Sequence, residues 1–157
     1  MNQHAPEVML PIAAIRVGNR LRDVDMDHAQ FLSVSMDERG LDTALQVREP
    51  DKNGKHRLIA GAHRLAAAKL LGWQEVPVKI YSVDDLTARL MEVDENLFRR
   101  ELSPLDRAIF LSQRKEVYEA LHPETRRGGD RTQTENLVSL IPSFAEATAI
   151  KLGVDAR

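Results

Sequence analysis

The segment Leu58-Ile-Ala-Gly-Ala-His-Arg-Leu-Ala-Ala-Ala-Lys69 decides the fold of this 157-residue chain. Its apolar start predicts a strand, His56–Ala60, that delivers the chain to Gly61. The residues after Gly61 are rich in alanine and leucine, which favour helix, and Gly72 is a typical helix stop. The sequence therefore predicts a strand, a glycine and a helix from about Ala62 to Leu71 in immediate succession.

Further elements surround this junction and share one pattern, in which short apolar strands alternate with amphipathic helices. The Asn53-Gly54 pair predicts a tight hairpin turn. Pro11 predicts an edge strand around it, because proline cannot donate a ladder hydrogen bond. The chain as far as residue 81 is therefore expected to form one mixed α/β module with a small mixed sheet. Its other expected elements are a strand at Met9–Ile15, a helix at Asp25–Arg39, and strands at Ala44–Arg48 and Val76–Tyr81.

Helix signals replace the alternation after residue 81. Ser103 and Pro104 predict a strong helix start, and the helix should end near Leu121. Ser143 and Glu146 predict a capping box. We expect an α+β protein with residues 1–81 as a nucleotide-binding module, 82–122 as helices that complete its site, and 123–157 as a loop and the start of a helix-turn-helix without its recognition helix. The remaining expected elements are a helix from Ser82–Asp85 through Val93, a polar loop at Thr125–Glu135, and a helix to Leu152 that Gly153 ends.

Composition excludes several classes of protein. Lys and Arg number 22 and Asp and Glu 24, so the formal net charge is −2, which excludes a histone-like polycation but not a local basic patch. The chain has no cysteine, which excludes disulfide frameworks and thiol chemistry. No apolar run approaches the ~20 residues that span a bilayer, and the N-terminus lacks a signal-peptide pattern. We expect a cytoplasmic protein without a membrane partner.

The strand–glycine–helix junction is a candidate anion site. The first turn of a helix presents unpaired backbone N–H groups and the positive end of the helix dipole. Gly61 lets a ligand approach the backbone closely, and His63 and Arg64 add donors beside it. These residues can cradle phosphate groups. A plain tight turn with an exposed Arg64 explains the same residues equally well.

A second candidate lies in the segment Asp94-Glu-Asn-Leu-Phe-Arg-Arg100. Asp94, Glu95 and Asn96 supply adjacent oxygen ligands of the kind that suits Mg²⁺, and Arg99 and Arg100 after them suit the phosphates that the metal would bridge. The alternative is a solvated corner between two helices with surface ion pairs. Composition alone favours that alternative, since such charge clusters are common on surfaces.

Together these segments resemble the N-terminal domain of the ParB family of DNA-partition proteins, part of the wider ParB/sulfiredoxin-like fold. The matching pieces follow in family order from about Met9 to Ala108. Residues 58–69 resemble the family's phosphate motif, Gly-Glu-Arg-Arg followed by small residues. Glu95–Arg99 resembles its Glu-Asn-Leu-Gln-Arg segment. The other pieces are Gly40-Leu41, Leu45–Arg48, Val76–Val78 and Leu102–Pro104.

The resemblance implies that CTP, or another nucleoside triphosphate, binds with Mg²⁺ and closes the protein as a clamp on DNA, with slow hydrolysis at most. It implies that Glu95 holds the metal or positions a water as the catalytic residue, with Asn96 as a second metal ligand. It also implies DNA as a partner of the full-length protein, a homodimer, a partition ATPase and a nucleoid- or plasmid-associated location. The nucleotide would be held by Gly61, Ala62, His63, Arg64, Thr43, Asn96, Arg99 and Arg20 or Arg22.

The chain departs from the family motif, because Gly-Glu-Arg-Arg is here Gly61-Ala62-His63-Arg64. Sulfiredoxin chemistry is excluded, since it needs a cysteine that this chain lacks. Two other functions remain open on this fold: a small-molecule phosphotransferase or nuclease, and a protein-interaction module that ignores nucleotides. Contacts of this chain with DNA are expected to be weak, salt-sensitive and independent of sequence, and to come from Arg126, Arg127 and Arg131.

Overall fold

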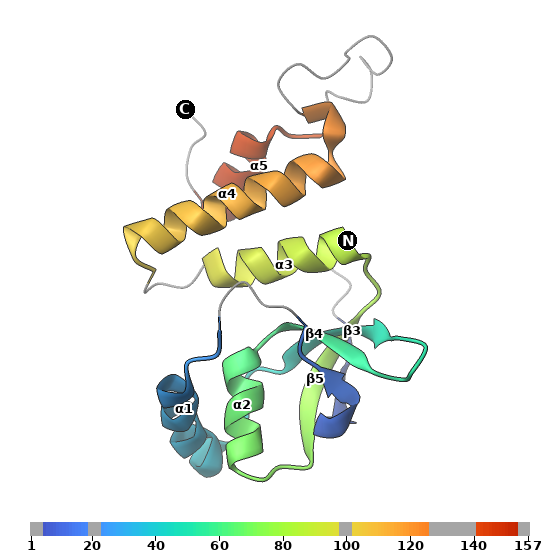
Figure 1. Cartoon of the computed structure of the whole chain (residues 1–157), viewed down its shortest axis with the longest axis vertical. Helices are drawn as coiled ribbons and strands as arrows, with labels where there is room; N and C mark the ends of the chain where they lie inside the picture. Colours follow the sequence, from blue (N-terminus) through green and yellow to red (C-terminus); the bar gives the residue numbers. More distant parts are fainter. Residues whose placement is uncertain (1–4, 19–22, 98–101, 126–140, 154–157) are drawn as a thin grey trace. The chain divides into compact units, whose positions relative to one another are not determined.

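The computed structural model describes residues 5–18, 23–97, 102–125 and 141–153. The chain divides into two compact units, Met1–Asp84 and Asp85–Arg157. Figure 1 shows the elements of both units.

The first unit contains a five-stranded mixed sheet in the order β1-β5-β3-β4-β2. Strand β5 pairs antiparallel with β1 and parallel with β3, and β4 pairs antiparallel with β3 and parallel with β2. The expected small mixed sheet is therefore confirmed. The strands are β1 (Glu7–Pro11), β2 (Ile15–Arg16), β3 (Leu45–Pro50), β4 (His56–Ala60) and β5 (Glu75–Tyr81), and the helices are η1 (Ile12–Ala14), α1 (Met26–Arg39) and α2 (Ala62–Leu70).

The prediction of a single strand at Met9–Ile15 is wrong. The chain leaves β1 at Pro11, makes a 3-10 turn, and enters β2 at the opposite edge of the sheet. The turn starts where the Ile12 N–H donates to the carbonyl of Gln74 at 2.8 Å. Pro11 ends the strand, because proline has no N–H with which to extend a ladder. The expected edge position of β1 is confirmed.

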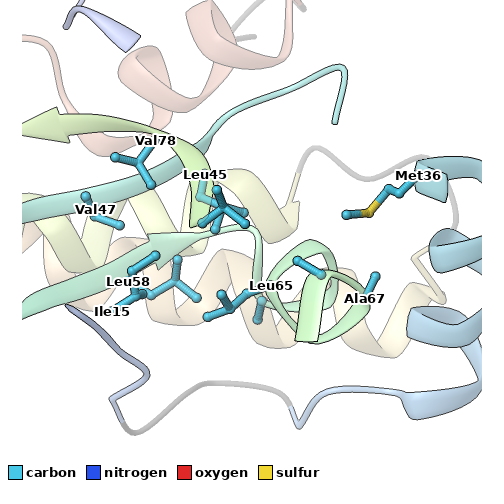
Figure 2. Packing of buried hydrophobic residues seen from close by; sticks show 11 residues of the cluster. Ile15, Met36, Leu45, Val47, Leu58, Leu65, Ala67 and Val78 are labelled. Atoms are coloured by element: carbon cyan, nitrogen blue, oxygen red, sulfur yellow. The ribbon is translucent and has the colours of Figure 1, made fainter. Parts of the chain in front are cut away.

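The core of the first unit is aliphatic and lies between the sheet and α2, which packs beside α1 (Figure 1). Leu45 and Val47 of β3 and Leu65 of α2 are fully or almost fully buried. Met36 of α1 points toward α2 in Figure 2. Small alanines along α2 allow this close packing of helices. Such burial contributes roughly 1.5–3 kcal/mol for each large side chain.

The second unit consists of α3 (Asp85–Leu97), α4 (Pro104–Leu121), η2 (Pro123–Thr125) and α5 (Phe144–Leu152). Helices α3 and α4 lie side by side and run in opposite directions (Figure 1). Ser103 caps α4 by accepting the Asp106 N–H at 3.1 Å, as its sequence predicts. Both halves of the expected capping box are present at the start of α5. No helix in the described ranges is long and apolar enough to cross a membrane.

Candidate functional site

The junction between β4 and α2 is built around Gly61. Its φ of +100° and ψ of 30° lie in the left-handed region, which favours glycine. A Cβ at this position would lie 2.6 Å from Cδ2 of Leu45 and 3.3 Å from Cζ of Arg64. Both the backbone conformation and the packing therefore require glycine. Gly61 also has no side chain that could cap the first-turn N–H groups of α2.

Arg64 ties this junction to the segment that leads into β3. Its Nη1 donates to the carbonyl of Thr43 at 2.6 Å and to that of Ala44 at 3.1 Å. The structure thus brings together Thr43, Gly61 and Arg64, three residues that the family resemblance assigns to nucleotide binding. Nucleotide binding by these residues stays a prediction.

His63 connects the junction to the start of α1. Its Nε2 accepts the backbone N–H of Asp25 at 3.1 Å, which places the ring proton on Nδ1 in the neutral form. The His28 ring packs edge-on against the His63 ring with centroids 5.1 Å apart. The Asp25 carboxylate caps α1 by accepting from the N–H groups of Asp27 and His28. The spacing of 35 residues between His28 and His63 gives no sequence pattern that could reveal this pair.

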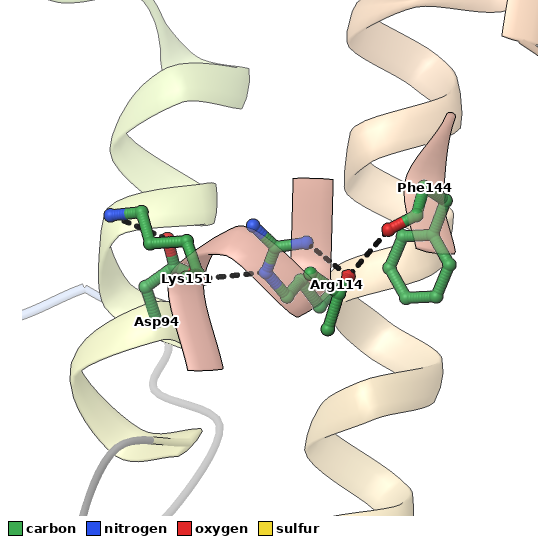
Figure 3. A network of polar contacts seen from close by, with 5 residues as sticks. Asp94, Arg114, Phe144 and Lys151 are labelled. Carbon is green, nitrogen blue, oxygen red and sulfur yellow. Dashed lines mark hydrogen bonds and ion pairs between the residues drawn. The ribbon is translucent and has the colours of Figure 1, made fainter. Parts of the chain in front are cut away.

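The segment Asp94–Asn96 lies in the last turn of α3 in the second unit. For Asp94 and Asn96 the interpretation as part of a solvated corner is wrong, because these residues are only 8% and 7% exposed. Arg99 and Arg100 lie outside the described residues. Asn96 Nδ2 donates to the carbonyl of Glu92 at 2.8 Å, which leaves Oδ1 as the amide atom able to bind a cation. The Asp94 carboxylate accepts from Arg114 Nε at 2.8 Å and pairs with Lys151 Nζ at 3.4 Å (Figure 3). Asp94 therefore has two cationic partners within the second unit.

No group of three or more acidic or histidine side chains that could hold a metal occurs within the described part of the chain. The two site residues from α3, Glu95 and Asn96, would thus supply only part of a magnesium shell. Mg²⁺ commonly keeps several waters and takes one or two protein ligands together with phosphate oxygens. The donor set fits that use. The arginines expected to contact the nucleotide, Arg99 and either Arg20 or Arg22, lie outside the described residues. The arginines expected to contact DNA, Arg126, Arg127 and Arg131, also lie outside them.

Comparison with protein families gives one matching family model, that of the ParB N-terminal domain, over residues 2–97. A probable plasmid-partitioning protein ParB of Thermus thermophilus is 32% identical over 110 residues, which are 69% of this chain and 36% of that protein. A nucleoid occlusion protein of Geobacillus thermodenitrificans is 31% identical over 155 residues, which are 94% of this chain and 54% of that protein. The chain spans about a third to a half of the length of these relatives.

Two crystal structures of the C-terminally truncated chromosome-partitioning protein ParB from Caulobacter crescentus are similar in fold. The structure complexed with CTP-γ-S has a TM-score of 0.56 and 22% identity, and the match covers 96% of this chain and 73% of that one. The structure complexed to the centromeric parS site has a TM-score of 0.61 and 20% identity, and the match covers 95% and 66%. At these identities the similarity concerns the fold alone.

Proposed function

The chain belongs to the ParB N-terminal domain family, and on that premise we propose that it is the nucleotide-sensing part of a partition or nucleoid-occlusion protein. In this proposal CTP binds with Mg²⁺ and acts as a conformational switch for a clamp on DNA. The CTP-γ-S complex of the Caulobacter protein supports the choice of nucleotide. The relatives' names support a function on DNA.

One observation carries the proposal most directly: the geometry at Gly61. The residue leaves the first turn of α2 without a side-chain cap, and a single added methyl group would collide with Leu45 and approach Arg64. Backbone N–H groups at such a helix start bind phosphate oxygens, and the helix dipole favours their negative charge. The residues present therefore fit a triphosphate.

The neighbouring side chains have distinct roles in this proposal. Arg64 holds the carbonyls of Thr43 and Ala44 in place, and its guanidinium contributes positive charge to the cradle. His63 positions the N-terminus of α1 beside the cradle through the Asp25 N–H. Ala62 brings its backbone N–H and no bulk. We also propose Arg22 and Arg99 as phosphate ligands.

From the second unit we propose Glu95 and Asn96 as the ligands of Mg²⁺, whose chemistry would be to neutralise phosphate charge. Glu95 is also the proposed residue that orients a water for slow hydrolysis of the nucleotide. Its carboxylate is the acidic group directly before Asn96 in the segment that resembles the family's Glu-Asn-Leu-Gln-Arg motif.

The proposed DNA contacts of the chain come from Arg126, Arg127 and Arg131. The Caulobacter relative in complex with parS supports a DNA partner, and a helix-turn-helix beginning with α5 would supply the specific contacts in a longer protein. We further propose a homodimer and a partition ATPase as protein partners, and a location on the nucleoid or a plasmid.

A thermal-shift titration with CTP, ATP and GTP, each with and without Mg²⁺, tests the proposal. A ligand that binds only the folded state stabilises it by about 2.7 kcal/mol at a hundredfold excess over Kd. We expect a magnesium-dependent rise in Tm that is selective for CTP. R64A should reduce the rise, and R39A is the matched control, because Arg39 lies at the end of α1 and bonds only to Ser35 among the contacts described for it.

Each of the other results assigns a different function. A shift with ATP alone, accompanied by turnover, would favour a phosphotransferase. Metal-dependent nicking of DNA would favour a nuclease. No shift with any triphosphate at millimolar concentration would reject the nucleotide switch and leave a protein-interaction module.

A further inference from the structure

Arg114 is the most deeply buried charged residue described in the second unit, with 2% of its surface exposed. It lies on α4 between Phe110 and Tyr118, which are also buried, so it occupies the inward-facing stripe of the helix. A buried cation is stable only when it is paired and hydrogen-bonded. The partners of Arg114 therefore identify the helices that this residue connects.

The Asp94 carboxylate is the point where three helices meet. Arg114 Nε from α4 donates to Oδ1 at 2.8 Å, and Lys151 Nζ from α5 lies 3.4 Å from Oδ2. Figure 3 shows this carboxylate of α3 between the two cations. One negative charge is thus shared by two positive charges from different helices, so displacing it weakens both pairs.

Arg114 also reaches α5 directly. Its Nη1 donates to Thr148 Oγ1 at 2.6 Å, and that hydroxyl donates to the carbonyl of Phe144 at 2.6 Å (Figure 3). The guanidinium carbon lies 5.7 Å from the centroid of the Phe144 ring, within the range of a cation–π contact. Helix α5 has nine residues, and helices shorter than about 12 residues are marginal alone. These contacts are therefore a main reason that α5 is held.

The shared carboxylate directly precedes Glu95 and Asn96, the proposed metal ligands. Asn96 is bonded back to the carbonyl of Glu92, so residues 92–96 form one hydrogen-bonded helical segment that includes Asp94. A ligand that moves this segment, or adds charge beside it, changes the position or the ion pairs of the Asp94 carboxylate. Since coupling between sites is reciprocal, the docking of α5 must then affect the ligand as well.

We propose that Arg114 is a positioning residue that couples ligand binding at Glu95–Asn96 to the docking of α5, through Asp94 on one side and Thr148 on the other. This inference rests on the proposed function, because it takes CTP with Mg²⁺ as the ligand. It adds a specific route by which the bound nucleotide changes the docking of α5.

Amide hydrogen exchange of residues 144–152, measured with and without CTP and Mg²⁺, tests the coupling in the whole chain. Coupling free energies typically correspond to factors of about 5–150. We expect the nucleotide to change exchange in α5 at least fivefold in the wild-type chain. In T148V the change should fall below twofold, and the CTP affinity should change by no more than the coupling factor that is lost. K151M, which alters a half-exposed side chain, should reduce the change by a smaller factor.

K115M is the matched control, because Lys115 is the next residue on α4 and makes only an exposed pair with Glu119 at 3.9 Å among its described contacts. It should retain the full nucleotide effect. Wild-type chain that binds CTP without any change at 144–152 overturns the inference alone. Wild-type chain that fails to bind CTP overturns the proposed function and the inference with it. An undiminished nucleotide effect in both T148V and K151M also overturns the inference.

Discussion

Replacing Gly61 with alanine is expected to destabilise the first unit by about 2–5 kcal/mol. Two costs add in this figure. A left-handed conformation costs a residue with a Cβ about 1–2 kcal/mol, and Gly61 has a φ of +100°. The new Cβ would lie 2.6 Å from Cδ2 of Leu45, which is fully buried. Forcing such a side chain to move in a packed core costs about 1–3 kcal/mol.

Gly72 provides a control that separates the two costs. It also has a positive φ, +70°, but a Cβ there would meet nothing within 4 Å. G72A should therefore suffer the conformational cost only. Urea denaturation of both variants gives the free energies of unfolding, compared through the midpoints at constant m-value. We expect G61A to be less stable than G72A by about 1–3 kcal/mol.

A double variant tests the stated cause of that difference. L45V removes the terminal carbons of the colliding side chain, so G61A combined with L45V should cost less than the sum of the two single changes. Residues in contact typically show interaction energies of about 0.5–3 kcal/mol. Equal stabilities of G61A and G72A, or strict additivity with L45V, would refute the argument that Leu45 requires glycine at position 61.

Three further predictions concern other contacts. R64K should destabilise the first unit by about 1 kcal/mol in urea denaturation, because Lys Nζ lies one bond nearer the backbone than Arg64 Nη1 and so does not reach both carbonyls; unchanged stability would contradict it. The Ser143 hydroxyl, and then the Ser143 N–H, lower the pKa of Glu146, so this carboxylate stabilises α5 above the usual glutamate pKa and loses that effect as pH falls through the lowered value. An NMR titration of the Ser143 amide should show its transition there, and a transition above the usual range would disprove it. Y118F should destabilise the second unit by about 0.5–1.5 kcal/mol in thermal unfolding, since it removes the bond from the Tyr118 hydroxyl to the carbonyl of Pro142; a more stable variant would argue against that bond.

The helix boundaries could be predicted because their signals are local. Ser103, Ser143 and Gly153 each act on atoms within four residues, so their effect is visible in the sequence. The same holds for the Asn53-Gly54 turn, where Asp51 accepts from the N–H groups of Asn53 and Lys55. Those two bonds also lower the pKa of Asp51, and the bond from the Lys55 N–H has the larger effect.

The parts that sequence reasoning missed depend on residues far apart in the chain. The strand expected at Met9–Ile15 is divided because its two ends pair with different partners, β5 at one edge of the sheet and β4 at the other. Apolar periodicity within seven residues cannot distinguish one strand from two that lie at opposite edges. The His28–His63 contact likewise depends on the packing of α1 against α2.

Arg114 shows where a sequence signal existed and was not used. The buried positions of α4 are Phe110, Arg114 and Tyr118, spaced four residues apart, so a cation interrupts an otherwise aromatic stripe. A charge on the inward face of an amphipathic helix implies a buried partner of opposite charge, because an unpaired charge there would be very costly. Such a stripe predicts that an acid on a neighbouring helix is buried as well, and this would have favoured a buried Asp94 over a solvated corner. The sequence alone could not identify Asp94 or Thr148, since they lie 20 and 34 residues from Arg114 and only the packing of three helices brings them to it.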